Sequence, residues 1–119
     1  MTPLVLDRSL TQADFDLFAR VSGDNNPIHV DAAFSARTSF GRTVSHGMLL
    51  YTVFWGLLRR AHPKARQASQ NLMFPNPAYA DEPLRFTATP TGPLAYSIDV
   101  RRLADDAVVC TGDTQLAEG

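Results

Sequence analysis

The sequence has a single cysteine, no marked excess of either charge and no long apolar stretch, and each absence excludes a class of protein. The lone Cys110 excludes an internal disulfide. A formal net charge of −1 gives none of the basic excess that nucleic-acid binding needs. The most apolar run, residues 47–58, is too short to span a bilayer and contains polar residues. We therefore expect neither a nucleic acid nor a membrane as a partner.

Signals for targeting, metals and cofactors are also missing. Residues 1–4 lack the basic region and apolar core of a secretory signal, which together with the lone cysteine predicts a cytoplasmic protein. His29, His46 and His62 are not spaced as metal ligands relative to nearby carboxylates, and no glycine-rich phosphate loop occurs. We expect no metal and no cofactor.

The pattern of apolar residues predicts one domain over residues 1–119. Thr11 is typical of a helix N-cap, and Gly23 can end that helix in a left-handed conformation. Residues 24–29 should form the loop that follows. Ser45 is a plausible N-cap for a second long helix over residues 47–58. Because that helix is apolar nearly all round, we expect it to be buried on every side.

The second half of the chain is typical of antiparallel strands. Apolar residues alternate with polar ones around Phe86, Ile98 and Cys110, so one face of each strand should pack against a core. A strand is also expected over residues 71–74, and Val108 should lie on the same side as Cys110. Turn residues at 92–93 and 105–106 predict hairpins. One buried helix followed by such strands indicates an α+β fold.

The segment Gly23–His29 carries the strongest functional signal. It places the carboxylate of Asp24 and the imidazole of His29 five positions apart, with a turn between them. A carboxylate and an imidazole that share one water can divide the roles of general base and general acid. A structural turn with a packed histidine is the alternative interpretation of this spacing alone.

A longer set of residues resembles the signature of the MaoC-like dehydratases, which include the (R)-specific enoyl-CoA hydratases. The matching residues are Phe18-Ala19, Ser22-Gly23-Asp24, Asn26-Pro27-Ile28-His29, Asp31, Phe40-Gly41 and His46-Gly47-Met48. The resemblance implies a single hot-dog domain, in which a curved antiparallel β-sheet wraps one long central helix. It implies a hydro-lyase that adds water to a trans-2-enoyl thioester, on CoA or on acyl-carrier protein, to form an (R)-3-hydroxyacyl thioester.

The same resemblance assigns roles to four residues. Asp24 and His29 match the catalytic pair, and Gly47 matches the glycine whose backbone N–H lies in the oxyanion hole. Asn26 matches an asparagine that orients the loop or the substrate, although a purely structural turn is an equal alternative. His46 is expected to bond to the backbone, and Asp31 to cap a helix.

Two alternatives to the hydro-lyase function are a thioesterase and a non-catalytic subunit, and the resemblance also predicts an assembly. A hot-dog thioesterase would usually carry an acidic residue on the central helix, and residues 47–58 contain neither Asp nor Glu. A non-catalytic acyl-thioester-binding subunit would not need Asp24 and His29. The family pairs two protomers edge to edge, which implies a homodimer with two-fold symmetry and an active site near the interface.

Overall fold

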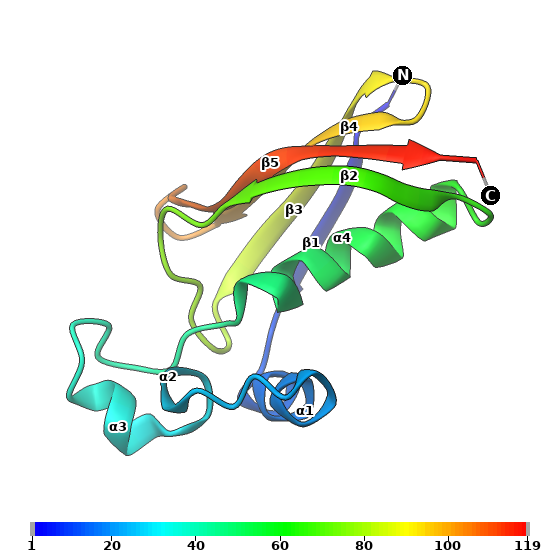
Figure 1. The fold of residues 1–119 in the computed structure, drawn as a ribbon. Coiled ribbons are helices and arrows are strands. Elements are labelled where there is room, and N and C mark those ends of the chain that lie inside the picture. Colours follow the sequence, from blue (N-terminus) through cyan, green and yellow to red (C-terminus); the bar gives the residue numbers. More distant parts are fainter. Residues whose placement is uncertain (1, 119) are drawn as a thin grey trace.

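The computed structural model describes residues 2–118 and shows one long helix lying across the inner face of a curved five-stranded sheet (Figure 1). The elements follow in the order β1 (Leu4–Ser9), α1 (Gln12–Ser22), α2 (Pro27–Val30), α3 (Ala32–Ala36), α4 (Gly47–Ala61), β2 (Arg66–Met73), β3 (Pro83–Gly92), β4 (Ala95–Arg102) and β5 (Val108–Ala117). The antiparallel strands lie in the order β1-β3-β4-β5-β2, so β1 and β2 are the edges. This arrangement confirms the expected hot-dog fold.

The alternating strands of the second half of the chain form one side of the core. Phe86 of β3 lies opposite Val100 of β4, and Ala88 lies opposite Ile98; all four side chains are fully buried. Phe54 of α4 packs edge-on against Phe86, with 5.5 Å between ring centroids. Alternation therefore places the apolar face of the sheet against α4, as predicted, and the expected hairpin turns fall between β3 and β4 and between β4 and β5.

Two details of the strands differ from expectation. β2 runs from Arg66 to Met73, so it begins earlier than residue 71 and leaves Phe74 outside. A register shift between Val100 and Arg101 in the pairing with β5 turns Val109 as well as Cys110 into the core, whereas Val108 is only half-buried. A bulge of this kind breaks strict alternation, which is why the prediction for Val108 was wrong. Burial raises the pKa of the Cys110 thiol to about 12, as suits a small core residue.

Helix α4 runs through the apolar residues 47–58 and on to Ala61, with Arg59 and Arg60 in its last turn. Its N-cap is His46 rather than Ser45, whose hydroxyl donates to the carbonyl of His46 instead. Phe54 and Leu58 are fully buried against the sheet, but Met48 remains 47% exposed. A single sheet covers only one side of a helix, so within one chain the burial of α4 is incomplete. Within residues 2–118, no helix has the length and apolarity to cross a membrane.

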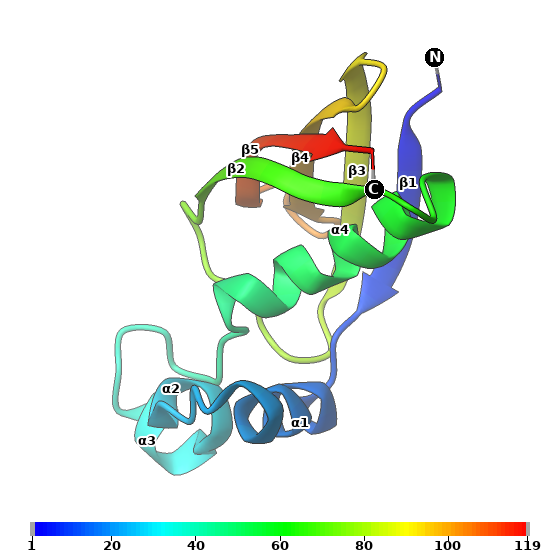
Figure 2. The same ribbon diagram turned by 45° about the vertical axis from the view of Figure 1, so that its right-hand side comes forward.

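The short helices α1, α2 and α3 form a separate layer beyond the N-terminal end of α4 (Figure 2). Thr11 caps α1 as predicted, in a reciprocal capping box with Asp14, and Gly23 ends it with φ 82°. Asp31 caps α3, also as predicted, by accepting from the N–H of Phe34. The expected loop over residues 24–29 is only half correct, because Pro27 presets a helical φ and α2 begins there.

Candidate active site

The structure brings the side chains of Asp24 and His29 together at the junction of α1 and α2. His29 Nε2 lies 3.8 Å from Asp24 Oδ2. His29 is 8% exposed, whereas the side chain of Asp24 is 56% exposed. The separation is too long for a good direct hydrogen bond but lets one water molecule contact both atoms. A buried imidazole and an accessible carboxylate therefore face a shared position that solvent or substrate can reach.

The orientation of the His29 ring is set by the chain that precedes α4. Its Nδ1 lies 2.8 Å from the carbonyl oxygen of Val44. A carbonyl only accepts, so Nδ1 carries the hydrogen, and in the neutral ring the lone pair is on Nε2, on the side of Asp24. The N–H of Val44 in turn donates to the carbonyl of Ile28, at 3.0 Å. This pairing presents a proton-accepting nitrogen to the shared position.

The backbone of Asp24 is held from two sides. Its N–H donates to the hydroxyl of Ser22 at 3.1 Å, and that hydroxyl donates to the carbonyl of Phe18 at 2.7 Å. Its carbonyl accepts from Nε2 of His46 at 2.9 Å. Gly23 supplies the left-handed turn that redirects the chain between these bonds. The carboxylate is therefore solvent-exposed on a backbone that is fixed.

His46 connects the two residues of the pair. It is only 2% exposed, and its ring stacks on that of His29 with 3.8 Å between centroids and 25° between planes. The rings of Phe18 and Phe15 meet its edge, at centroid distances of 4.8 and 6.5 Å. Burial lowers the pKa of His46, which favours the neutral ring. The backbone bond expected for His46 is confirmed, whereas its stacking on His29 had no signal in the sequence.

Polar side chains that the sequence did not reveal secure α2. Gln12 Nε2 donates to the carbonyl of His29 at 2.8 Å, and Gln12 Oε1 accepts from the hydroxyl of Thr43 at 2.6 Å. The fully buried hydroxyl of Ser35 donates to the carbonyl of Ile28 at 3.2 Å. These partners lie far apart in sequence, so no short motif could have identified them. They satisfy carbonyls of a helix too short to hold itself together.

Asn26 and Gly47 occupy the starts of two helices. Asn26 Oδ1 accepts from the N–H of Ile28 at 3.1 Å and so caps α2, as the turn interpretation of this residue requires. Gly47 is the first residue of α4, where the backbone N–H groups of the first turn have no partner within the helix. Because Gly47 follows His46 directly, this helix end adjoins the Asp24–His29 pair.

The expectation that the histidines are not spaced as metal ligands overlooked one cluster. Donor atoms of Asp24, His29 and His46 all lie within 4.8 Å of one another. Backbone carbonyls already occupy His29 Nδ1 and His46 Nε2. The two imidazole planes are nearly parallel, and they do not converge on a point about 2.0–2.1 Å from a nitrogen of each ring, as a shared metal ion requires. The cluster therefore fits a proton-transfer group better than a metal site.

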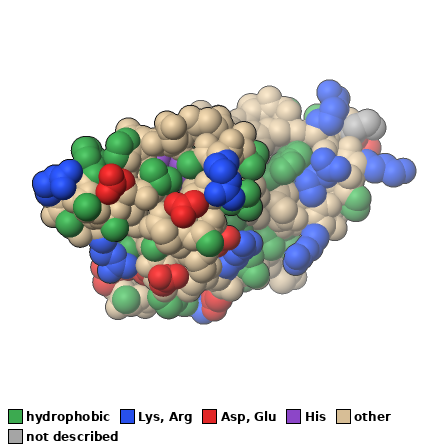
Figure 3. Space-filling view, turned by 90° about the horizontal axis from the view of Figure 1, so that it is seen from below, with side chains coloured by type: hydrophobic (Ala, Val, Ile, Leu, Met, Phe, Trp, Pro, Cys, Tyr) green, Lys and Arg blue, Asp and Glu red, His purple; other side chains and the backbone are tan. Residues whose placement is uncertain are grey.

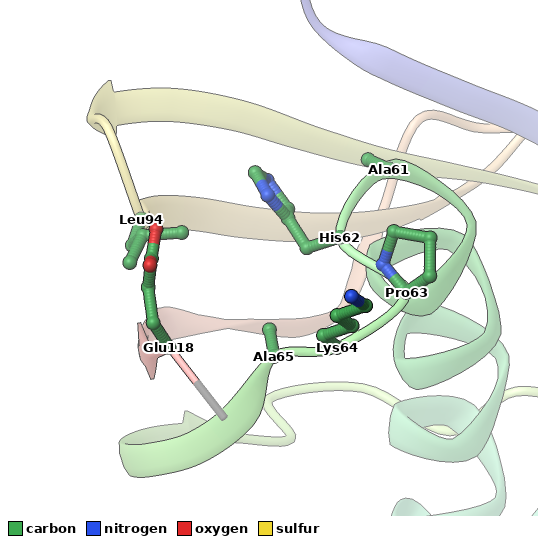
Figure 4. Close-up of a pocket in the computed structure, with 7 residues that line it drawn as sticks. All are labelled: Ala61, His62, Pro63, Lys64, Ala65, Leu94 and Glu118. Atoms are coloured by element: carbon green, nitrogen blue, oxygen red, sulfur yellow. The ribbon is translucent and has the colours of Figure 1, made fainter.

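The end of α4 away from Gly47 borders a cavity. A cavity of about 370 Å³ is lined by Ala61, His62, Pro63, Lys64, Ala65, Leu94 and Glu118 (Figure 4). His62 Nε2 there lies 2.7 Å from the hydroxyl of Tyr96. The 15 residues of α4 place this cavity roughly 20 Å from Gly47. It is therefore separate from the Asp24–His29 pair.

The outer face of the helical layer carries both charged and apolar side chains. Seen from below, acidic and basic side chains are scattered among apolar ones, and a histidine is visible only as a small area (Figure 3). The exposed apolar residues of this layer include Leu17, Val21, Phe34 and Phe40. No single sign of charge dominates this view, in keeping with the net charge of the chain.

Comparisons with known proteins agree with this geometry. The family model described as "MaoC like domain" matches residues 2–111. The chain is similar to an (R)-specific enoyl-CoA hydratase of Aeromonas caviae, with 33% identity over 113 residues that cover 93% of this chain and 77% of that protein. It is also similar to a mitochondrial 3-hydroxyacyl-[acyl-carrier-protein] dehydratase of Arabidopsis thaliana, with 33% identity over 72 residues, 60% of this chain and 43% of that protein.

A solved structure extends the similarity to the whole fold. The (R)-hydratase from A. caviae involved in PHA biosynthesis superposes with a TM-score of 0.88 at 27% identity. The match covers 99% of this chain and 95% of that one. Enzymes that act on CoA thioesters and on carrier-protein thioesters are thus both among the relatives, and both are hydro-lyases.

Proposed function

The chain belongs to the MaoC-like dehydratase family, and from this premise we propose that it catalyses the reversible, (R)-specific hydration of a trans-2-enoyl thioester to a 3-hydroxyacyl thioester. The observation that carries the proposal is the separation of 3.8 Å between His29 Nε2 and Asp24 Oδ2. These two atoms can hold one water molecule between them, which is the arrangement that addition of water to a double bond needs.

The proposed chemistry begins with this water. Its oxygen attacks C3 of the enoyl group while a proton passes to the Asp24–His29 pair. The π electrons of the C2–C3 bond move toward the thioester carbonyl to give an enolate, and a proton from the pair then reaches C2. The sum is one water molecule added across the double bond, with no net change in the enzyme. Dehydration reverses the same steps.

Stabilisation of the enolate is proposed to come from the start of α4. Negative charge collects on the thioester oxygen, and a backbone N–H already aimed at that oxygen stabilises the charge without reorganisation. Gly47 offers such an N–H, and the positive end of the α4 dipole adds to it. The Asp24–His29 pair adjoins this helix end through His46, which stacks on His29 and bonds to Asp24.

The experiment that tests the activity is incubation with crotonyl-CoA, followed by both the loss of enoyl absorbance and the release of free thiol. We expect absorbance to fall without thiol release. Release of free CoA would instead identify a thioesterase, and the absence of both signals with CoA and with carrier-protein substrates would identify a non-catalytic subunit. The ratio of rates on crotonyl-CoA and on the crotonyl carrier protein decides which carrier the enzyme uses.

A homodimer is proposed as the working form of the enzyme. Met48 on the outer side of α4 is 47% exposed, and Met73 at the end of edge strand β2 is 66% exposed. An unpaired edge strand with apolar residues beside it invites pairing with another chain. Joining two β2 edges around a two-fold axis would extend the sheet and cover the outer side of α4.

Sedimentation measured together with activity tests this assembly. We expect a dimer of the 13.1 kDa chain, and activity that falls in proportion when dilution dissociates it. A monomer that keeps full activity would contradict both the dimer and the placement of the active site near its interface.

A further inference from the structure

Phe74 occupies the space that a side chain at position 47 would take. A Cβ on Gly47 would lie 2.7 Å from Cζ of Phe74, 2.8 Å from Cε2 and 2.9 Å from Cε1. These distances are far below the van der Waals contact of two carbons, so the tip of the ring rests directly against the Cα of Gly47. A methyl group at position 47 would therefore require the tip of the Phe74 ring to move.

The direction of this contact places the ring beside the free N–H groups of α4. In an α-helix each Cα–Cβ bond tilts toward the N-terminus, which is also the direction in which the unbonded N–H groups of the first turn point. A ring that fills the Cβ position of the first residue therefore lies at the open end of the helix. His46, which precedes Gly47, contacts both members of the Asp24–His29 pair from the same end.

The remainder of the Phe74 ring is free. The side chain follows the last residue of β2, precedes Pro75 and remains 45% exposed even though its tip is packed on Gly47. A cavity of about 540 Å³ lined by Gly23 and Asn25 lies next to Asp24. A substrate that reaches from this pair to the start of α4 meets the exposed part of the Phe74 ring.

We propose that Phe74 is a specificity-determining residue that packs against the thioester end of the substrate and selects against substituents at C2. This inference rests on the proposed function. If the thioester oxygen accepts from the Gly47 N–H, then C1 and C2 lie within a few bond lengths of a ring that touches Gly47. A flat, unsubstituted enoyl group can lie along the ring, whereas a methyl group on C2 must displace it.

The test compares two substrates in the whole protein. Crotonyl-CoA and 2-methylcrotonyl-CoA differ by one methyl group at C2, and kcat/KM is measured for both with wild type, Phe74→Ala and Phe74→Leu. One methylene in a fitted pocket changes specificity by about 10- to 200-fold, so we expect Phe74→Ala to raise the ratio of methylated to unmethylated substrate by at least about tenfold. Phe74→Leu should give an intermediate ratio.

Leu17→Ala is the control, because Leu17 is an apolar residue of α1 with a similar exposure, 52% against 45% for Phe74. It should leave the ratio unchanged. An unchanged ratio in both Phe74 variants, with equal loss on the two substrates, would overturn the proposal. Sedimentation at the assay concentration tests whether Phe74 instead belongs to the dimer interface. Phe74 variants that no longer form the dimer but keep the wild-type ratio of kcat/KM values would place Phe74 in the interface and would also overturn the proposal.

A double substitution checks the contact itself. Gly47→Ala should lower the unfolding temperature, because its methyl group meets the Phe74 ring, and adding Phe74→Ala should reduce the cost of Gly47→Ala. Additive effects would refute the contact. Failure of the proposed function is a separate result: wild type would then hydrate neither substrate, whereas failure of the Phe74 inference leaves the hydration of crotonyl-CoA intact.

Discussion

The sheet with α4 and the layer of α1 to α3 differ in the contacts that hold them together. In the first region the contacts are mainly apolar, with Phe54, Phe86 and Ile98 fully buried between helix and sheet. In the second, the buried Phe15 is joined by several polar contacts: a capping box at Thr11, the Gln12 bonds to α2 and Thr43, and the buried hydroxyl of Ser35. The apolar region supplies a rigid support, and the polar region holds Asp24 and His29 in place.

This difference explains where chemistry can take place. Directional hydrogen bonds in the layer of α1 to α3 fix the backbone of Asp24 and leave its carboxylate 56% exposed. The two regions meet at the start of α4, where His46 belongs to the helix of one and stacks on a residue of the other. Stability and activity should therefore respond to different substitutions.

The largest effect on stability is expected in the apolar region. Phe54→Ala removes a fully buried ring that packs on Phe86, and should lower the free energy of unfolding by about 3–5 kcal/mol. Leu17→Ala, at a position of α1 that is 52% exposed, is the control and should change it by less than about 0.5 kcal/mol. Denaturant unfolding at fixed protein concentration measures both. Equal effects would show that the apolar region does not dominate stability.

The largest effect on activity is expected in the polar region. Asp24→Asn and His29→Ala should each lower kcat by at least about a hundredfold, as loss of a general acid or base does. Asp31→Asn is the control, because Asp31 caps α3 through Phe34 and plays no part in the proposed reaction. Circular dichroism should show all three variants folded. Full activity in either variant of the pair would refute the assignment.

A smaller effect is expected from the cap that starts the polar region. Thr11→Ala removes the oxygen that accepts from the Asp14 N–H at 3.1 Å, and should lower the free energy of unfolding by about 1 kcal/mol. Thr91→Ala, on the exposed part of β3, is the matched control. If thermal unfolding shows that the two substitutions lower the free energy of unfolding equally, the capping box makes no specific contribution to stability.

The smallest effect concerns the pH dependence of stability. Burial lowers the pKa of His46, and the hydrogen bond to the carbonyl of Asp24 opposes this; the charge of His29 lowers the pKa further and that of Asp24 raises it, while Phe15 and Phe18 face the ring from α1. The unfolded chain takes up a proton near pH 6.5, but the folded protein resists until a lower pH. Neutral His46 therefore favours the folded state fully above about pH 6.5, and this stability is lost as the pH falls below that value toward the lower pKa of the folded protein. Unfolding free energies from about pH 7 to about pH 5 should decline more steeply in wild type than in His46→Gln; parallel profiles would contradict this account.

The sequence predicted the fold well where a local pattern was enough. Thr11, Gly23 and Asp31 act as the caps that their residue types indicate, and period-two alternation located the core faces around Phe86 and Ile98. Prediction failed where a partner segment decides the outcome. The bulge beside Val100, which turns Val109 into the core, depends on the register with β5.

For the candidate site, the sequence located the Asp24–His29 pair but not the residues that support it. Asp24 and His29 lie close in sequence, and the turn between them brings them together as expected. Gln12 and Phe74 contact this region from 17 and 27 residues away, at His29 and Gly47 respectively, and neither belongs to a recognisable motif. Such contacts arise only when the chain folds back on itself, so they have no local signature.

The most direct test of the central claim is the configuration of the product that the wild-type protein forms from crotonyl-CoA. If Asp24 and His29 deliver water to one face of an enoyl group held at the start of α4, the product is (R)-3-hydroxybutyryl-CoA in large excess, as chiral separation after hydrolysis would show. An (S) product or a racemate would contradict the proposed site, and so would recovery of unchanged substrate from both crotonyl-CoA and the crotonyl carrier protein.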